Sequence, residues 1–462
     1  MTIAEIKAEY AAGASVRSVV EAAIARARSD TRNAVLEVIE ERALVRADEL
    51  DQRRAAGESL GLLDGIPFLA KDNILTFNSR TTASSHMLEN FEAPYQATVI
   101  EKLEAAGAIC VGKTNLDSFA HGGSTENSYF GPTHNVTDDD RVAGGSSGGS
   151  AVAVAAGIVP FALGTDTGGS IRQPASYNGV YGLKPTYGSV SRYGVIAMAS
   201  STDVVGPITT CVEDARLVLD VLLGVDERDS TTISVEPLVP TTKKLSVGVI
   251  AECMGDGVDA EVRTLTEGVI EQLKAAGHEV TTVHLPTVKY ALAVYYIVVP
   301  AELTSNLARY DGIKYGTSKD GGTLGAVYAN SRSAGFMDEN KRRILIGNYV
   351  LSSGYYDAYY HKAQAVRTLI INEFTEAFKA VDVLLSPTAP TPAFKLGENT
   401  ADPLSMYMSD IMTVPSSLAG LPAISVPIGT TKAGLPVGLQ FVAPMCRDDV
   451  VVSAAKLLED MQ

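Results

Sequence analysis

The alternation of helical segments with short apolar runs constrains the fold of this chain more than any other feature of its sequence. The helical segment ATVIEKLEAAG, residues 97–107, is followed at once by the apolar run AICVG, and SAVAVAAGIV, residues 150–159, is followed by PFALGTD. Later apolar runs of strand length include KLSVGVI, VDVLLSP and LPAISVPIG. Such alternation is typical of an α/β fold, so the sequence predicts helices packed around a buried, mixed β-sheet.

One domain is expected over residues 1–462, because no linker rich in Pro, Gly or Ser divides the chain. Residues 1–60, including the segment VLEVIEERALVRADELDQRRAAG, are predicted to be helical, since their apolar residues recur at three- and four-residue steps. The core is expected at about 61–225 and 380–462. Between them a helical excursion is predicted at about 225–380, with strands at KLSVGVI and after the helix that ends in AAGHEV.

Charge and cysteine content exclude several classes of function. The chain has 38 Lys and Arg against 54 Asp and Glu, a net charge of −16, so it is not expected to bind DNA or RNA by itself. Its four cysteines, at positions 110, 211, 253 and 446, are far apart, which argues against a zinc site or disulfide framework.

No apolar run is long enough to span a membrane, and MTIAEIKAEYAAGAS lacks a signal core, so a cytoplasmic location is expected.

Two runs rich in glycine and serine mark the candidate site. GGSSGGS begins at Gly144 and TDTGGS ends at Ser170, and neither has a histidine close in sequence. A serine needs a base to take its proton, and a buried lysine can be that base because burial lowers its pKa. Lys71 follows the apolar strand IPFLA and is therefore the candidate base. Taken singly, GGSSGGS is as typical of a flexible loop, and Lys71 is more typical of a surface or ion-paired lysine.

The TDTGGS run also offers consecutive backbone N–H groups. Those of Thr167, Gly168, Gly169 and Ser170 are candidates for an oxyanion hole. Glycine permits the unusual torsions that would let these groups converge on one developing negative charge. The same run would then present both the nucleophile and the groups that stabilise its reaction intermediate.

GGSSGGSAVAVAAG, TDTGGSIRQPASYNGVYGLKPTYG and IPFLAKDN together resemble the amidase signature family. The resemblance implies an α/β fold whose mixed sheet is covered by helices on both faces, and a Lys–Ser–Ser triad. It makes Lys71 the base, Ser146 the bridging serine after a cis peptide bond from Gly145, and Ser170 the nucleophile. The spacings, 146 − 71 = 75 and 170 − 146 = 24 residues, match those of the family.

Four more positions follow from the same resemblance. Asp166 and Arg172 are expected to pair across the loop that carries the nucleophile, in a structural role. Two positions depart from the family's pattern near the site: His121 stands where an apolar residue is general, and Asn178 where cysteine is common. Neither departure touches the triad.

Longer stretches, residues 84–135, 184–208, 341–370 and 402–427, are similar to one branch of the family, the A subunits of glutamyl-tRNA(Gln) amidotransferases. This implies a glutaminase that forms a γ-glutamyl ester on Ser170 and releases ammonia. It implies a B subunit that holds the tRNA and uses ATP and Mg²⁺ to convert Glu-tRNA(Gln) to Gln-tRNA(Gln), and a small C subunit. No cofactor or metal is expected in this chain, and neither DNA nor a membrane is expected as a partner.

Free glutamine has an α-ammonium and an α-carboxylate, so its pocket needs an anion and a bidentate cation. By position in the branch's motifs, Asp410 is expected to hold the ammonium, Arg343 the carboxylate, and Tyr295 to line the side-chain amide. From the residues alone, each of these positions has a second interpretation. Arg343 also fits a solvated helix face. Tyr295 equally fits packing in the core, and Asp410 also fits the cap of a helix.

Other functions fit the sequence less well. GAICVGKT, residues 107–114, matches the phosphate-loop pattern, but the residues between its glycines are themselves an apolar strand. Both glycine runs fit the nucleophile elbow of α/β-hydrolases, whose chemistry requires a histidine, and none of the six histidines lies in a recognisable partner motif. The main alternative is a free-standing amidase acting on another small amide. An inactive scaffold subunit is disfavoured by the intact triad.

Overall fold

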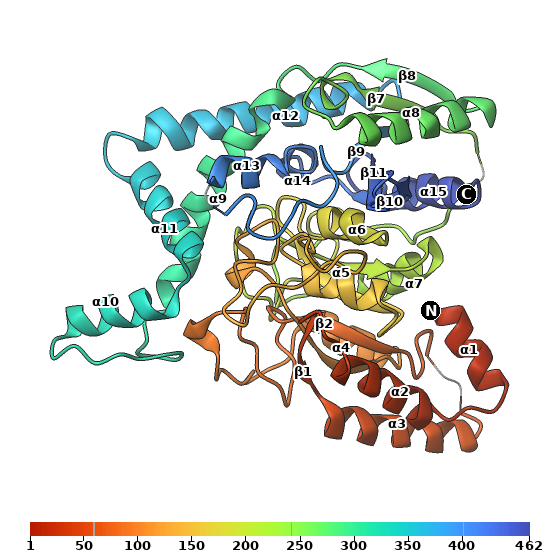
Figure 1. Cartoon of the computed structure of the whole chain (residues 1–462), viewed down its shortest axis with the longest axis vertical. Coiled ribbons are helices and arrows are strands. Elements are labelled where there is room, and N and C mark those ends of the chain that lie inside the picture. Colours follow the sequence, from red (N-terminus) through yellow and green to blue (C-terminus); the bar gives the residue numbers. More distant parts are fainter. Residues whose placement is uncertain (59–60, 242, 401) are drawn as a thin grey trace.

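In the part of the chain that the structure describes, residues 1–58, 61–241, 243–400 and 402–462, an eleven-stranded mixed β-sheet forms the centre of the molecule (Figure 1). This structure is a computed structural model. From one edge of the sheet to the other, the strands are β1 (Val35–Val38), β3 (Ile109–Thr114), β2 (Pro67–Lys71), β4 (Phe161–Asp166), β6 (Val204–Thr209), β5 (Tyr181–Lys184), β10 (Ala423–Thr430), β11 (Pro436–Val442), β9 (Val383–Pro387), β7 (Ser246–Ile250) and β8 (Glu279–Val283).

The direction of the strands determines where the candidate site lies. Strand β2 runs parallel to both β3 and β4, β7 runs parallel to β8 and β9, and the pairs between these two groups are antiparallel. Ala70 of β2 pairs with Leu163 of β4, so the carboxyl ends of these neighbours meet at one edge of the sheet. Lys71 ends β2 and Asp166 ends β4, which brings the candidate base close to the TDTGGS loop.

Helices cover both faces of the sheet, as predicted. Phe68 and Ala70 of β2 belong to one apolar cluster, and Leu69 between them belongs to another, because successive strand side chains point to opposite faces. The cluster of Leu69 includes residues of α2 (Val16–Arg28), α3 (Glu40–Ala55), α5 (Gly148–Ala155) and α6 (Arg172–Asn178). The cluster of Phe68 includes residues of α1 (Ile3–Ala11), α4 (Thr98–Ala105), α7 (Val212–Leu222), α8 (Ala260–Ala275) and α15 (Asp448–Glu459).

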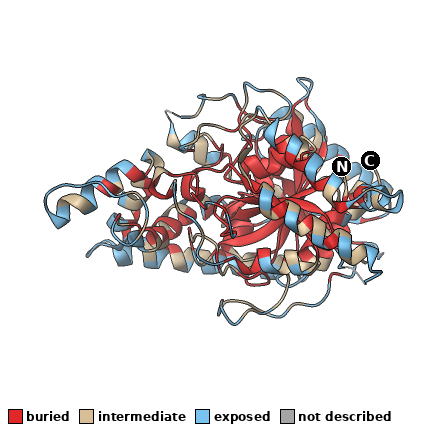
Figure 2. Ribbon diagram, turned by 90° about the horizontal axis from the view of Figure 1, so that it is seen from below, coloured by how far each residue is buried: buried red, intermediate tan, exposed pale blue. Residues whose placement is uncertain are grey.

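The remaining helices form an arm and its junction with the body. They are α9 (Ala291–Asn306), α10 (Leu324–Gly335), α11 (Asp338–Leu351), a π-helix (Tyr356–His361), α12 (Lys362–Ala377), α13 (Pro403–Met408) and α14 (Val414–Leu418). Short 3-10 helices lie at His86–Leu88, Ser118–Ala120, Ala251–Cys253, Val288–Tyr290 and Leu307–Arg309. Helices α10 and α11 protrude from the body in Figure 1, and exposed residues dominate the arm in Figure 2, whereas buried ones fill the sheet.

Helix α9 joins the arm to the body. It packs against α11, α12 and α14. The stretch Val288–Arg309, which contains α9, is the one helical stretch among the described residues that is long and apolar enough to cross a membrane. More than half of its most apolar part is buried inside the protein, as expected of a core helix.

One prediction of secondary structure was wrong. The segment VLEV at residues 35–38 was predicted to begin a helix, but it is strand β1, which pairs antiparallel with β3, and the helix begins at Glu40. Its β-branched valines fit a sheet edge, and a four-residue run is too short for periodicity to separate helix from strand. The strands predicted within the excursion at about 225–380 are β7 and β8, and they lie in the same sheet as the core strands.

Candidate active site

Lys71 is the last residue of β2, and its side chain is completely buried. Its Nζ lies 2.8 Å from the hydroxyl oxygen of Ser146, 2.9 Å from that of Ser147 and 2.9 Å from that of Thr165. Burial lowers the pKa of Lys71 from 10.5 to about 7, although nearby carboxylates act in the opposite direction. An amine with this pKa is partly uncharged near neutrality and can accept a proton from a hydroxyl. The structure therefore places the predicted base away from solvent and in contact with Ser146.

Ser146 and Ser170 come together through the backbone. A cis peptide bond joins Gly145 to Ser146, as the family resemblance implied. The N–H of Ser147 donates to the carbonyl of Ser170 over 3.1 Å, which ties the first glycine run to the second. Among the described residues, no hydrogen bond joins the hydroxyl of Ser146 to that of Ser170, and Ser170 retains a small exposed surface of 8%. Its assignment as nucleophile stays a prediction that this placement supports.

The loop before Ser170 is held so that its N–H groups remain free. The carbonyl of Gly168 accepts from the hydroxyl of Thr413 over 2.6 Å, and the carbonyl of Gly169 accepts from the N–H of Gln173 over 2.8 Å. Within the described ranges, the N–H groups of Gly168, Gly169 and Ser170 have no hydrogen-bond acceptor. Gly169 has a φ of +145°, and a Cβ there would lie 2.1 Å from the Thr413 hydroxyl oxygen. Free donors on a rigid loop are what an oxyanion hole requires.

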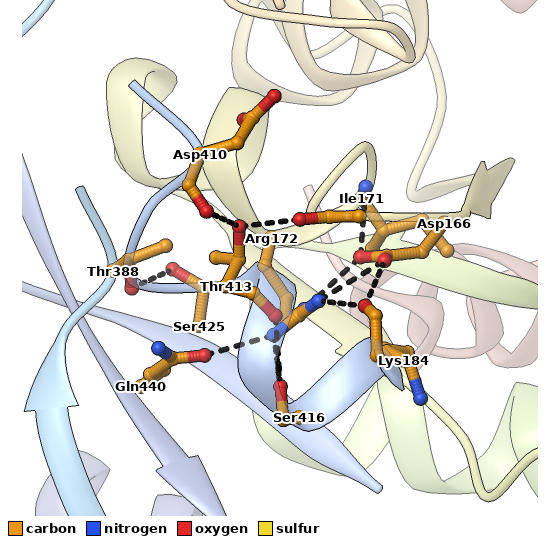
Figure 3. Close-up of polar contacts among 12 residues, drawn as sticks. Asp166, Ile171, Arg172, Lys184, Thr388, Asp410, Thr413, Ser416, Ser425 and Gln440 are labelled. Atoms are coloured by element: carbon orange, nitrogen blue, oxygen red, sulfur yellow. Dashed lines mark hydrogen bonds and ion pairs between the residues drawn. The ribbon is translucent and has the colours of Figure 1, made fainter. Parts of the chain in front are cut away.

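Arg172 anchors this loop, as predicted. Its guanidinium forms two hydrogen bonds of 3.0 Å with the carboxylate of Asp166, and both side chains are fully buried. Its remaining N–H groups donate to Ser416, Ser417 and Gln440 (Figure 3). Burial alone would raise the pKa of Asp166, but the Arg172 guanidinium holds it below its ordinary value. The pair fixes the end of β4 against the start of α6, in a structural role.

Asp410 lies between α13 and α14, with its carboxylate facing the glycine loop. A Cβ on Gly169 would lie 3.4 Å from its Oδ1, and a Cβ on Gly123 would lie 3.4 Å from its Oδ2. The Oδ1 atom is buried, and no group in the described part of the chain donates to it. Burial raises the pKa of Asp410 to about 8. An ammonium bound here would stabilise the carboxylate and lower that pKa.

Arg343 lies on α11 and is only 3% exposed, so it does not belong to a solvated helix face. Its Nε donates to Glu339 over 2.7 Å, and its guanidinium carbon lies 5.1 Å and 5.4 Å from the ring centres of Tyr296 and Tyr407. It also lines a cavity of about 270 Å³. Nη2 lies 3.4 Å from the hydroxyl oxygen of Tyr296, so Nη1 is the guanidinium nitrogen that has no acceptor among the described residues.

Tyr295 and the two departures from the family pattern can also be located. The ring of Tyr295 packs on the glycine loop, because a Cβ on Gly168 would lie 2.7 Å from it. Asn178 is structural, since its amide donates to the carbonyls of Ala143 and Pro174 over 2.7 and 2.8 Å. His121 is fully buried and lines the same cavity as Arg343.

Several residues of the site were missed by the sequence analysis. Thr165 contacts Lys71 through its hydroxyl, and Asn73 donates to the same hydroxyl over 3.1 Å. Thr167 donates its hydroxyl to the buried carboxylate of Asp203 over 2.7 Å, which orients the start of the glycine loop. Thr165 could have been found from its place beside Asp166 at the end of a buried strand. Asn73 ends the IPFLAKDN motif, two residues after Lys71, whereas Asp203 carries no local signal, because only the fold brings it to the loop.

The phosphate-loop pattern at 107–114 does not form a nucleotide site. Its residues Ile109–Thr114 are strand β3, as the sequence analysis expected. The ammonium of Lys113 is fully buried, lies 3.1 Å from the carboxylate of Asp72 and donates to the carbonyl of Ile74 over 2.8 Å. Across the described ranges, no group of three or more His, Cys, Asp or Glu side chains is placed to hold a metal ion.

Comparisons with known proteins point to one family. A family model described as Amidase matches residues 18–452. Two similar proteins are A subunits of glutamyl-tRNA(Gln) amidotransferases. The chain is 52% identical over 436 residues to the one from Thermosynechococcus vestitus, covering 93% of this chain and 90% of that protein. It is 53% identical over 434 residues to the one from a Cyanothece species, covering 92% of this chain and 90% of that protein.

Two solved structures are also similar to this chain over most of its length. The crystal structure of another of these A subunits, from Thermotoga maritima, superposes with a TM-score of 0.76 at 44% identity, covering 87% of this chain and 84% of that one. A structure described as an amidase superposes with a TM-score of 0.85 at 32% identity, covering 100% of this chain and 99% of that one.

Proposed function

This chain belongs to the amidase family, and from that membership we propose that it is the glutamine-hydrolysing subunit of an aminoacyl-tRNA amidotransferase. It is an amidase that forms an ester between Ser170 and the γ-carbonyl of glutamine. The ammonia that it releases serves the conversion of Glu-tRNA(Gln) to Gln-tRNA(Gln). The high identity to proteins named for that reaction supports this proposal.

The observation that carries the choice of substrate is the carboxylate of Asp410 against the loop before Ser170, whose buried Oδ1 receives no hydrogen bond from the described residues. Glutamine presents an α-ammonium to such a group, and its α-carboxylate matches the guanidinium of Arg343, whose Nη1 has no acceptor among the described residues. An apolar amide would leave the carboxylate of Asp410 without a donor and Arg343 with Glu339 as its one ion-pair partner among the described residues, which disfavours it. The alternative of a free-standing amidase for another small amide gains no support from these two residues.

The chemical step follows from the contacts of Lys71. The uncharged amine of Lys71 takes the proton of Ser146, and Ser146 takes that of Ser170 as the Ser170 oxygen forms a bond to the glutamine carbonyl carbon. The free N–H groups of the glycine loop stabilise the oxyanion. The relayed proton is then returned to the leaving nitrogen, the C–N bond breaks and ammonia departs. Water attacks the resulting γ-glutamyl ester by the same relay, which releases glutamate and restores Ser170.

The remaining parts of the reaction are assigned to partners. A B subunit would hold the tRNA and use ATP and Mg²⁺, and a small C subunit would join the complex, which would act in the cytoplasm. The net charge of −16 supports this division, because an acidic chain is a poor site for a tRNA backbone. The names of the relatives, each describing one part of a larger enzyme, support the existence of partners.

The proposal is tested with the purified complex of this chain and its partner subunits. Ser170→Ala is expected to abolish amidation of Glu-tRNA(Gln) with glutamine as donor, and to leave amidation with free ammonia intact. Arg343→Ala, which keeps the triad, is expected to raise the KM for glutamine strongly and also to leave ammonia use intact. Glutamine-dependent amidation by Ser170→Ala would refute the assignment of the nucleophile.

A further inference from the structure

His121 is a buried residue whose contacts leave one of its ring nitrogens unused. The residue is completely buried and follows the 3-10 helix Ser118–Ala120. Its Nδ1 lies 3.0 Å from the side-chain nitrogen of Asn340 and 3.1 Å from the carbonyl oxygen of Ser118. Its Nε2 is also buried, and no hydrogen-bond partner for it occurs in the part of the chain that the structure describes.

The contacts of Asn340 decide which nitrogen of His121 carries the proton. The side-chain oxygen of Asn340 accepts from the N–H of Met337 over 3.1 Å and from the hydroxyl of Ser118 over 2.9 Å, which fixes the orientation of the amide. The amide nitrogen donates one hydrogen to the carbonyl of Ser118 over 2.8 Å. The same carbonyl also accepts from the backbone N–H of His121 over 3.0 Å, so both of its lone pairs are used, and the second amide hydrogen of Asn340 is available to Nδ1 of His121 at 3.0 Å. Nδ1 therefore accepts, and in a neutral imidazole the proton must then be on Nε2.

His121 is connected to Arg343 through helix α11. Asn340 and Arg343 are three residues apart on α11, so their side chains share one face of the helix. Both His121 and Arg343 line the cavity of about 270 Å³, together with Tyr407. Gly123, two residues after His121, lies against the carboxylate of Asp410. The loop at 121–123 thus runs between the two residues assigned to the charged ends of glutamine.

His121 is uncharged in this position. Burial lowers its pKa to about 3, and the positive charge of Arg343 acts in the same direction. A neutral imidazole adds a hydrogen-bond donor to the pocket without adding a second positive charge beside Arg343. A buried donor without an acceptor is unfavourable, so an acceptor supplied by a ligand is the arrangement that satisfies it.

We infer that His121 is a specificity-determining residue that donates its Nε2–H to the α-carboxylate of the amino-acid substrate, beside Arg343, with Asn340 as the positioning residue that fixes its tautomer. The inference rests on the proposed function. It assigns the carboxylate two donors of different kinds, a charged guanidinium and a neutral imidazole. Because the α-carboxylate takes no part in bond making, loss of this contact should change the KM rather than kcat.

The test compares two substrates that differ only in the carboxylate. Ammonia release by the purified complex is measured with glutamine and with 4-aminobutanamide, which is glutamine without its α-carboxylate. His121→Leu is expected to reduce kcat/KM for glutamine about 10- to 100-fold, the range for a hydrogen bond to a charged group, with little effect on kcat. The preference for glutamine over 4-aminobutanamide is expected to fall by the same factor.

A matched pair of variants separates the donor from packing. His121→Gln places an amide N–H near the position of Nε2 and is expected to restore at least part of the preference. His121→Asn places its amide near the position of Nδ1 and is expected not to restore it. This pair decides the question even if the apolar variant fails to fold.

Equal loss of activity toward both substrates in His121→Leu and His121→Gln would show a structural role and overturn the inference. If His121→Leu kept the wild-type preference for glutamine over 4-aminobutanamide, the inference would be overturned as well. In either case, a wild-type complex that hydrolyses glutamine would leave the proposed function intact. A wild-type complex that does not hydrolyse glutamine would overturn the proposed function and this inference together.

Discussion

Raising the pH from 6 to 8 is expected to increase the rate of acylation of Ser170 about tenfold, because Lys71 can act as a base only when its amine is uncharged. With a pKa of about 7, the uncharged fraction of Lys71 is roughly 0.09 at pH 6 and roughly 0.91 at pH 8. The rate should then level off above pH 8. A lysine that kept the ordinary pKa of 10.5 would instead give a rise of about 100-fold over the same interval, without a plateau.

The assay is a single-turnover measurement of ammonia release by the assembled complex at saturating glutamine. Saturation matters because the pKa of Asp410 is also raised, to about 8, in the ligand-free protein. Bound glutamine holds that carboxylate ionised, so the observed pH dependence reports on Lys71. As a control, Lys71→Ala is expected to react at least about 10²-fold more slowly and to lose the pH dependence between 6 and 8.

Two outcomes would refute this reasoning. A rate that continues to rise about tenfold per pH unit through pH 8 would mean that burial does not lower the pKa of the base. A Lys71→Ala variant that keeps the wild-type pH profile would mean that another group is titrating. In the first case Lys71 would still be buried, but the inference that burial lowers its pKa to about 7 would be wrong.

Two further predictions concern the glycine loop and its anchor. Arg172→Met leaves the carboxylate of Asp166 buried without its guanidinium and should lower the free energy of unfolding by about 3–5 kcal/mol in urea denaturation; a loss below about 1 kcal/mol would contradict the account of this pair. Gly169→Ala would bring a Cβ within 2.1 Å of the Thr413 hydroxyl oxygen and should reduce kcat about 10²-fold or more, measured as glutamine hydrolysis. Gly157→Ala, which also has a positive φ but no atom within 4 Å of its Cβ, is the matched control and should keep full activity.

The parts of the site that could be predicted from the sequence are those that lie in short contiguous motifs. Lys71 at the end of an apolar strand and the two glycine–serine runs are each recognisable locally, and the parallel pairing of β2 with β4 brings them together. Arg172, six residues from Asp166, could be predicted for the same reason.

The parts that could not be predicted depend on contacts between distant segments. Arg343 resembles a surface residue in the sequence because its neighbours on α11 are charged, and only the packing of Tyr296 and Tyr407 around it explains why it is buried. The unused nitrogen of His121 was invisible for the same reason, since its tautomer is set by Asn340, more than 200 residues away along the chain. Strand β1 was missed because it is too short to show a period of its own.

The arm formed by α9 to α12 has a consequence for how proteins of this shape can diversify. Tyr295 and Arg343 reach the pocket from α9 and α11, whereas the base and both serines stand on the sheet and the loops that follow its strands. Part of the substrate pocket is thus encoded in a stretch of the gene that contains none of the triad, although Asp410 and His121 lie outside that stretch. A lineage could exchange the arm and reshape the pocket for new compounds while inheriting the triad unchanged.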